Sequence, residues 1–271
     1  MSADAPIAAD QISGPEPATT ETSRLKLLFA DPGRVWNVIG IPIVVAIALT
    51  VLWFWVSPME LTTREATRLN APELQARALQ HIRLALTATF FIVAIAVPMG
   101  VMLTRPWARR VTPVFLAIAN AGQAIPSIGL MVLLAIWIDL GPRTAIMAVV
   151  AYCILPVLRN TMVGIRQVDP AIIEAGRGMG MTRTAVLARI ELPLAVPVML
   201  AGIRTALILA VGTITLGALI GAGTLGVIIN SGVVGFSNPV LITGAVLTAS
   251  LALMIDWVAG IAEIVLRPKG L

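Results

Sequence analysis

The sequence predicts an all-α membrane protein with about six transmembrane helices, and two observations support this prediction. The chain of 271 residues is 58% hydrophobic and only 12% charged, with a mean hydropathy of +0.94, which excludes a soluble globular protein. Apolar stretches of about 20 residues have the length that a helix needs to cross the hydrocarbon core of a bilayer. Six such stretches occupy residues 36–56, 84–103, 111–138, 145–163, 194–216 and 240–266.

The distribution of positive charge predicts the orientation of these spans. With a cytoplasmic N-terminus, 13 of the 19 lysines and arginines fall inside, five fall outside, and Arg204 lies within a span. The inside set is Arg24, Lys26, Arg34, Arg105, Arg109, Arg110, Arg159, Arg166, Arg177, Arg183, Arg189, Arg267 and Lys269; the outside set is Arg64, Arg68, Arg77, Arg83 and Arg143. Because cytoplasmic loops carry an excess of Lys and Arg, we expect both termini in the cytoplasm.

The region before the first span is predicted to be a separate tail. Residues 1–33 are small, polar and proline-containing, with too little apolar surface to fold alone, so we expect a disordered cytoplasmic tail. Residues 34–57 contain the first apolar run. No small-x-small cleavage site follows this run, which favours an uncleaved transmembrane helix over a signal peptide.

Residues 58–80 are predicted to form an external amphipathic segment between the first and second spans. Asn70 is placed as the N-cap of a helix, with Glu73 reaching back toward it. The apolar face of this helix would hold Leu74, Ala78 and Ile82. The pattern favours a short helix that lies at the membrane interface.

The third span is interrupted near its middle. Residues 122–129 place one proline and two glycines within 28 otherwise apolar residues, and Pro126 predicts a kink or break because it has no N–H. Irregular backbone at membrane depth is tolerated where it is buried in protein or lines a wet cavity, and broken helices in transporters mark substrate paths. Candidate residues of a translocation path are therefore Gln123, Ile125, Pro126 and Ser127. A kink that serves packing alone is the alternative.

A second glycine-rich segment, at 217–226, follows the fifth span. It does not match a phosphate-binding loop, because no lysine follows the glycines and no strand precedes them. The only lysines, Lys26 and Lys269, lie outside any glycine-rich loop. We therefore expect this chain to bind no cofactor itself. Close helix packing is the favoured interpretation of the segment, with a gate or a binding-protein contact as the alternative.

The sequence holds no constellation of residues for metal or covalent catalysis, so we expect that the chain is not an enzyme. His81, the only histidine, lies at the end of the external segment, where a structural role is favoured. Cys153, the only cysteine, lies within the fourth span and excludes a disulfide framework.

Two charges lie deep within apolar runs. Arg204 is 11 residues after Pro193, and Asp256 is 11 residues before Arg267. At about 1.5 Å per residue, both lie roughly 16 Å from the cytoplasmic side. An unpaired charge at this depth costs on the order of 3 kcal/mol, so equal depth makes Arg204 and Asp256 candidates for a buried ion pair. Separate vestibules for the two charges are the alternative.

Residues 174–193 form a polar, arginine-rich loop between two apolar runs, and such a loop must contact water or another protein. Glu174, Ala175 and Gly176 are followed by Gly180 and, after nine residues, by Ile190, Leu192 and Pro193. This spacing resembles the EAA loop of bacterial ABC importer permeases, although that family has Ala where this chain has Gly176. The resemblance implies a short cytoplasmic coupling helix that docks into a groove of an ATPase subunit.

The wider sequence, from about residue 81 to 268, is similar to permease subunits of glycine betaine/carnitine/choline importers. The matching strings are QAIPSIGLMVLLAIW, ILPVLRNTMVGIRQVDPAIIEAGRGMGMT, LPLAVPVMLAGIRTA and TLGALIGAGTLG. The resemblance implies a type I ABC importer permease in a bacterial inner membrane. Its five-helix core would occupy 81–268 with a cytoplasmic coupling loop at 166–193, and the helix at 34–57 would be an N-terminal addition.

The same resemblance implies partners and a substrate class. The partners would be a second permease subunit, identical or not, cytoplasmic ATPase subunits that bind ATP, and an extracytoplasmic solute-binding protein. The substrate would be a quaternary-ammonium osmoprotectant such as glycine betaine, choline or carnitine. The alternatives are an importer of another small solute, such as methionine or a sulfonate, and an ion-coupled secondary transporter with Arg204 and Asp256 as coupling residues.

Overall fold

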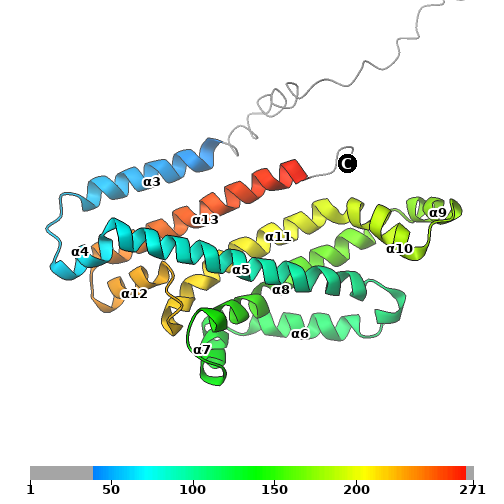
Figure 1. Ribbon diagram of the computed structural model, residues 1–271, viewed down its shortest axis with the longest axis horizontal. Helices are drawn as coiled ribbons and strands as arrows, with labels where there is room; N and C mark the ends of the chain where they lie inside the picture. Colours follow the sequence, from blue (N-terminus) through cyan, green and yellow to red (C-terminus); the bar gives the residue numbers. More distant parts are fainter. Residues whose placement is uncertain (1–38, 267–271) are drawn as a thin grey trace, which may run out of the picture. The chain divides into compact units, whose positions relative to one another are not determined.

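The computed structural model describes residues 39–266, and every regular element in this range is helical (Figure 1). The predicted tail at 1–33 lies outside the described residues. The α-helices are α3 (Ile41–Val56), α4 (Thr63–Leu69), α5 (Ala71–Leu103), α6 (Thr112–Ala124), α7 (Ser127–Trp137), α8 (Pro142–Arg166), α9 (Pro170–Gly178), α10 (Arg183–Val186), α11 (Leu192–Ile214), α12 (Gly226–Val234) and α13 (Asn238–Leu266). Shorter pieces are the 3₁₀ helices η2 (Pro106–Ala108) and η4 (Thr215–Ile220), and the π-helix η3 (Leu187–Glu191).

The helices correspond to the six predicted spans. Four stretches within 39–266 are long and apolar enough to cross a membrane: α5, α8, α13 and the continuous run Arg183–Ile220 that contains α11. A fifth span is formed by α6 and α7 together, which are bent by 97° at the break between them. At the position of the first predicted span lies α3, an apolar helix of 16 residues in the described part of the chain, which is shorter than the other candidate spans. A transmembrane role for α3 stays a prediction.

The prediction of a separate interfacial helix before the second span is wrong. α5 runs without a break for 33 residues from Ala71, because no glycine or proline interrupts it between Pro72 and Pro98. Asn70 does cap this helix, since its side chain accepts a hydrogen bond from the Glu73 N–H at 2.8 Å. The Glu73 carboxylate, however, pairs with Arg77 Nε at 2.9 Å instead of reaching back to the cap.

The short helix α4 carries the capping box that was expected one helix later. The Thr62 and Glu65 side chains each bond the other's backbone N–H. Ser237, in the turn between α12 and α13, donates its hydroxyl to Glu65 Oε1 at 2.5 Å. The hydrogen bonds from Ser237 and then Thr62 lower the pKa of the Glu65 carboxyl, so this residue holds α4 to the α12–α13 turn in its charged form.

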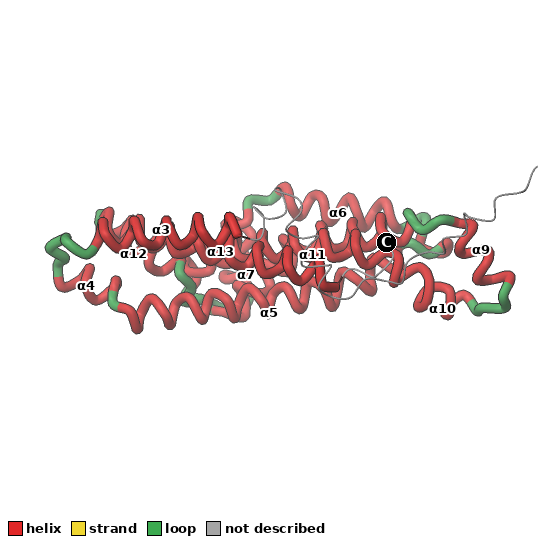
Figure 2. Tube along the Cα trace, turned by 90° about the horizontal axis from the view of Figure 1, so that it is seen from above, coloured by secondary structure: helices red, strands yellow, loops and turns green. Residues whose placement is uncertain are grey.

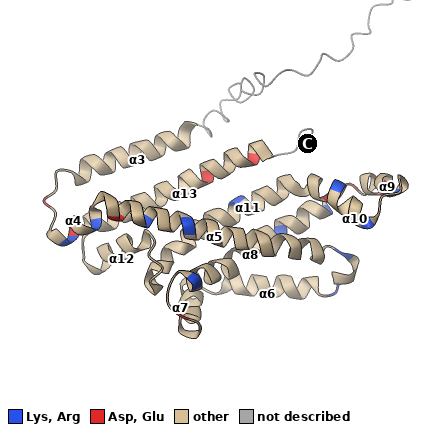
Figure 3. Cartoon of the chain, in the orientation of Figure 1, with Lys and Arg blue, Asp and Glu red and all other residues tan. Residues whose placement is uncertain are grey.

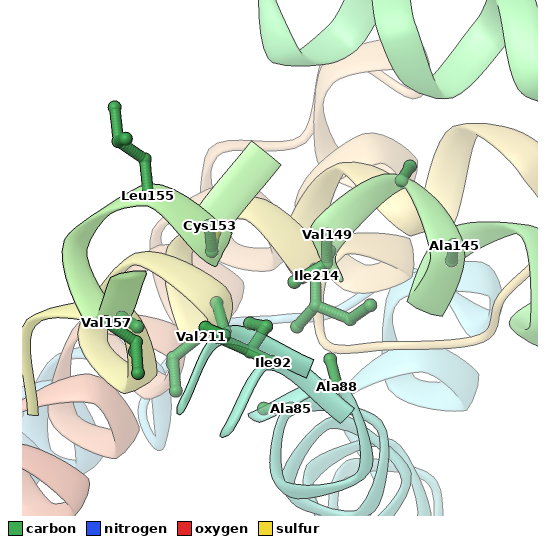
Figure 4. Close-up of a cluster of buried hydrophobic side chains, with 14 of the residues drawn as sticks. Ala85, Ala88, Ile92, Ala145, Val149, Cys153, Leu155, Val157, Val211 and Ile214 are labelled. Atoms are coloured by element: carbon green, nitrogen blue, oxygen red, sulfur yellow. The ribbon is translucent and has the colours of Figure 1, made fainter. Parts of the chain in front are cut away.

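The core is built where α8 packs against α5 and α11, and small side chains fill this contact (Figure 4). Buried residues drawn there include Ala85, Ala88 and Ile92 of α5, Ala145, Val149 and Cys153 of α8, and Val211 and Ile214 of α11. Small residues let membrane helices approach closely. A Cβ on Gly202 of α11 would lie 2.6 Å from Asn160 of α8, so this crossing leaves no space for a larger side chain.

His81 of α5 is fully buried against α11. Its Nε2 lies 3.0 Å from the Val211 carbonyl oxygen and ties the two helices together. This geometry supports the structural role that was favoured for it.

The glycine-rich segment at 217–226 packs closely against its surroundings. A Cβ on Gly226 would lie 1.9 Å from the Thr215 carbonyl oxygen, which is backbone and cannot yield. Gly221 and Gly223 each have a φ of +77°, a conformation that favours glycine. Close packing therefore accounts for Gly226 and Gly223, whose Cβ would lie 2.6 Å from Gln80, whereas Gly221 has nothing within 4 Å and is explained by its backbone conformation alone.

Candidate functional site

The polar loop predicted at 166–193 folds into the two short helices α9 and α10. In both views they lie together beyond the ends of α8 and α11 (Figures 1 and 2). α9 begins at Pro170, where a missing N–H breaks no helical hydrogen bond, and the Asp169 side chain accepts from the Ala171 N–H at 2.8 Å. The helix predicted around Glu174 is therefore present and begins four residues earlier. We call α9, α10 and η3 the coupling segment, after the role that the sequence resemblance implies for this loop.

Gly180 turns the chain between α9 and α10. Its φ of +84° lies in the left-handed region that favours glycine. The Gly180 N–H donates to the Arg177 carbonyl at 2.9 Å, and the Met181 N–H donates to the Gly176 carbonyl at 3.2 Å. These two bonds form a Schellman motif, which closes the C-terminus of α9.

Gly176 packs against the last part of the motif. A Cβ on Gly176 would lie 2.5 Å from Ile190 Cδ1, so the two ends of the sequence motif are in direct contact. Glu174 and Ala175, by contrast, are exposed on α9, and Met179 is 77% exposed. One side of α9, at Gly176, thus packs against η3. The other side, which carries the Glu174 carboxylate and apolar groups, is exposed and could contact a partner.

α10 continues into α11 through the π-helix η3. Thr182 begins α10, and its hydroxyl accepts a backbone hydrogen bond at 3.2 Å. Pro193 cannot donate to the i→i−4 ladder, which places an irregular turn just before it. Ile190 and Leu192 are half-buried in this transition, and Pro193 is exposed.

An ion pair that sequence reasoning missed fixes the end of the coupling segment to the α5–α6 connection. Arg105 Nη2 lies 2.5 Å from Glu191 Oε2, and the Glu191 side chain is buried. A buried carboxylate needs such a partner to remain charged. Nothing local distinguished Glu191 within this polar, arginine-rich loop, and its partner is 86 positions away, so spacing could not identify the pair.

The third span is broken where the sequence predicts. Ile125 and Pro126 adopt non-helical backbone between α6 and α7, and Ser127 begins α7. In this chain Ile125 and Pro126 are exposed, whereas Gln123 and Ser127 are half-buried. The Gln123 amide donates to the Tyr152 carbonyl of α8 at 3.2 Å, which fixes the end of α6.

The two charges predicted to pair, Arg204 and Asp256, lie together and are half-buried. Arg204 Nε is 2.6 Å from Asp256 Oδ1, and Arg204 Nη1 is 3.4 Å from Glu263 Oε2. Sequence reasoning did not include Glu263, although it lies two turns after Asp256 on α13 and so shares its face. The cluster contains one positive and two negative groups. In Figure 3 the two carboxylates appear as red bands on α13, with the α11 arginine in blue.

These arrangements define a class of protein: a multi-pass helical membrane protein with a structured polar segment at one end. The chain belongs to the family of binding-protein-dependent transport system inner membrane components, which matches residues 96–264. Its fold is that of a type I ABC importer permease. An inward-facing structure of the MetNI methionine ABC transporter superimposes with a TM-score of 0.65 and 25% identity, covering 74% of this chain and 100% of that chain.

Curated relatives cover most of the chain. It is 39% identical over 202 residues to the choline transport system permease protein OpuBB of Bacillus subtilis, which covers 74% of this chain and 92% of that protein. It is 37% identical over 220 residues to the osmoprotectant import permease protein OsmY of Salmonella typhimurium, covering 81% and 91% respectively. The carnitine transport permease protein OpuCD of Listeria monocytogenes is 38% identical over 190 residues, covering 70% and 84%.

Proposed function

We propose that this chain is the permease subunit of an ATP-driven importer for a quaternary-ammonium osmoprotectant such as glycine betaine, choline or carnitine. The observation that carries the proposal is the coupling segment, in which Gly176 contacts Ile190 and Gly180 forms the closing turn. The substrate class follows from the relatives, three of which are named for choline, carnitine or osmoprotectant transport.

The exposed side of α9 is the proposed docking surface for a cytoplasmic ATPase subunit. Glu174, Ala175 and Met179 lie on this side, while Gly176 faces the chain. ATP would bind to that subunit and not to this chain. The positive-inside bias supports a cytoplasmic location of the coupling segment and of both termini. A second permease subunit and an extracytoplasmic solute-binding protein would complete the importer.

The translocation path is proposed to run beside the break between α6 and α7. Exposed, non-helical backbone at Ile125 and Pro126 supports this assignment, because lipid-facing helices do not tolerate such backbone. Gln123 and Ser127 flank the break and supply its polar side chains.

Transport by the reconstituted complex tests the proposal. The permease, its ATPase and its binding protein are placed in liposomes, and uptake of labelled glycine betaine, choline, carnitine and methionine is compared with ATP enclosed or omitted. We expect ATP-dependent uptake of at least one quaternary ammonium compound and none of methionine. Uptake driven by an ion gradient without ATP would instead favour a secondary transporter, and uptake of methionine alone would reject the substrate class.

A further inference from the structure

A basic pocket lies beside the coupling segment, at the end of α5. It has a volume of about 600 Å³. Its lining residues are Leu103, Thr104, Arg105, Pro106, Arg109 and Arg166. Three of these six are arginines and none is acidic, so the pocket attracts an anionic occupant.

Two of the three pocket arginines lack a compensating charge in the described part of the chain. Arg105 is engaged by Glu191. Between residues 39 and 266, no ion pair joins either Arg109 or Arg166 to a carboxylate. Both residues are exposed, so their positive charges are available to an anion that enters the pocket. The guanidinium fork matches phosphate oxygens in geometry as well as in charge.

The pocket lies where membrane helices end. Leu103 is the last residue of α5 and Arg166 the last of α8, and both helices are long and apolar enough to span a bilayer. Trp107, between the pocket residues Arg105 and Arg109, is 67% exposed. Tryptophan is enriched at the level of lipid headgroups. The nearest abundant phosphate at this depth is therefore that of a membrane lipid.

We propose that this pocket binds the phosphate group of an anionic phospholipid, with Arg109 and Arg166 as its principal contacts. Arg105 links the pocket to function, because the same side chain holds Glu191 at the end of the coupling segment. The proposal does not depend on which solute is transported. A free phosphate ion offers the same chemistry, so the test must separate the two sources.

Native mass spectrometry of the full-chain permease measures this binding directly. The purified protein is incubated with phosphatidylglycerol or with phosphatidylcholine of the same acyl chains, and the lipid retained is counted. We expect preferential retention of phosphatidylglycerol. The double variant Arg109→Gln, Arg166→Gln should lower its affinity roughly 30-fold, since each arginine near a headgroup contributes about fivefold. Arg110→Gln is the matched control, because Arg110 adjoins Arg109 but does not line the pocket.

Three outcomes would overturn the proposal. Equal retention of the two lipids by the wild-type protein rejects it without reference to any variant. Displacement of phosphatidylglycerol by millimolar inorganic phosphate would identify a soluble anion as the occupant. Unchanged lipid retention in the double variant, together with lost association of the ATPase subunit, would show that the pocket instead receives a carboxylate of that partner.

Discussion

The side chain of Gln123 donates a hydrogen bond to the Tyr152 carbonyl oxygen, and Pro156 explains why that oxygen is free. In an uninterrupted helix the Tyr152 carbonyl would accept from the N–H of residue 156, which proline lacks. An unsatisfied carbonyl is costly at membrane depth. Gln123 therefore satisfies the free carbonyl of α8 and at the same time fixes the end of α6, two residues before the break at Ile125.

Replacing Gln123 should test this relationship through a double-mutant cycle. Gln123→Met should lower the free energy of unfolding by about 1 kcal/mol, the net worth of one such hydrogen bond. In a Pro156→Ala background the loss should fall to less than half, because the restored backbone N–H bonds the Tyr152 carbonyl. Denaturant unfolding of the purified permease in detergent measures both values. An equal loss in the two backgrounds would contradict the proposed role.

Cysteine accessibility should report whether the break lines the path. With Cys153→Ala as the background, single cysteines at positions 123–127 should react with a water-soluble thiol reagent in one conformational state of the complex. They should be protected in the other state. The two states are obtained by adding ATP to the complex or omitting it. A cysteine at Val149, which is fully buried, is the control and should stay inert in both. Inertness at all five positions would favour a kink that serves packing alone.

The close contact between Gly176 and Ile190 predicts a size limit at position 176. Gly176→Ala should transport normally, because its Cβ meets only the mobile end of the Ile190 side chain. Gly176→Leu should separate α9 from η3 and reduce coupled ATP hydrolysis and uptake at least tenfold. Adding Ile190→Ala to Gly176→Leu should recover part of the activity. If Gly176→Leu transports like the wild type, the contact does not matter for coupling.

The substitutions that position 180 tolerates should be set by the backbone conformation there and not by the space around the side chain. Nothing lies within 4 Å of a Cβ at this position, but the φ of +84° strains most residues by about 1–2 kcal/mol. Gly180→Asn should therefore keep most transport, whereas Gly180→Val and Gly180→Trp should abolish it while the permease remains inserted. Uptake assays with ATPase association as the second readout measure this. Normal uptake by Gly180→Trp would remove the coupling assignment.

Features that depend on local sequence were predictable here. Apolar length identified the spans and Pro126 identified the break, because each follows from the chemistry of neighbouring residues. Equal depth also brought Arg204 to Asp256, since rise per residue is fixed in a helix.

Features that depend on tertiary packing were not predictable. The Arg105–Glu191 pair joins the α5–α6 connection to η3, and only the folded bundle brings these two segments together. The burial of His81 followed from the unbroken run of α5 through this position into the second span, which periodicity alone did not reveal. Glu263 was overlooked because it lies near the end of a span, where a charged residue is expected to face the membrane interface and needs no partner within the protein.

The ion pairs of Arg204 with Asp256 and Glu263 predict an order in which substitutions lower the free energy of unfolding. Arg204→Ala leaves two carboxylates, Asp256 and Glu263, without a counter-charge in an apolar span, so it should cost about 3 kcal/mol. Asp256→Ala should cost less, because Arg204 keeps Glu263 at 3.4 Å, and Glu263→Gln should cost least. The exchange Arg204→Asp with Asp256→Arg should recover part of the loss.

The amount of folded permease, measured by size-exclusion chromatography of a fluorescent fusion, ranks these variants. A loss of folded permease from Glu263→Gln as large as that from Arg204→Ala would contradict this order.

The same three charged groups are expected to affect the transport of a cation. Because carboxylates outnumber the single guanidinium, the cluster does not repel a quaternary ammonium, whereas Asp256→Asn combined with Glu263→Gln leaves an uncompensated positive charge. If the substrate passes near this cluster, that double variant should slow uptake of choline more than uptake of zwitterionic glycine betaine.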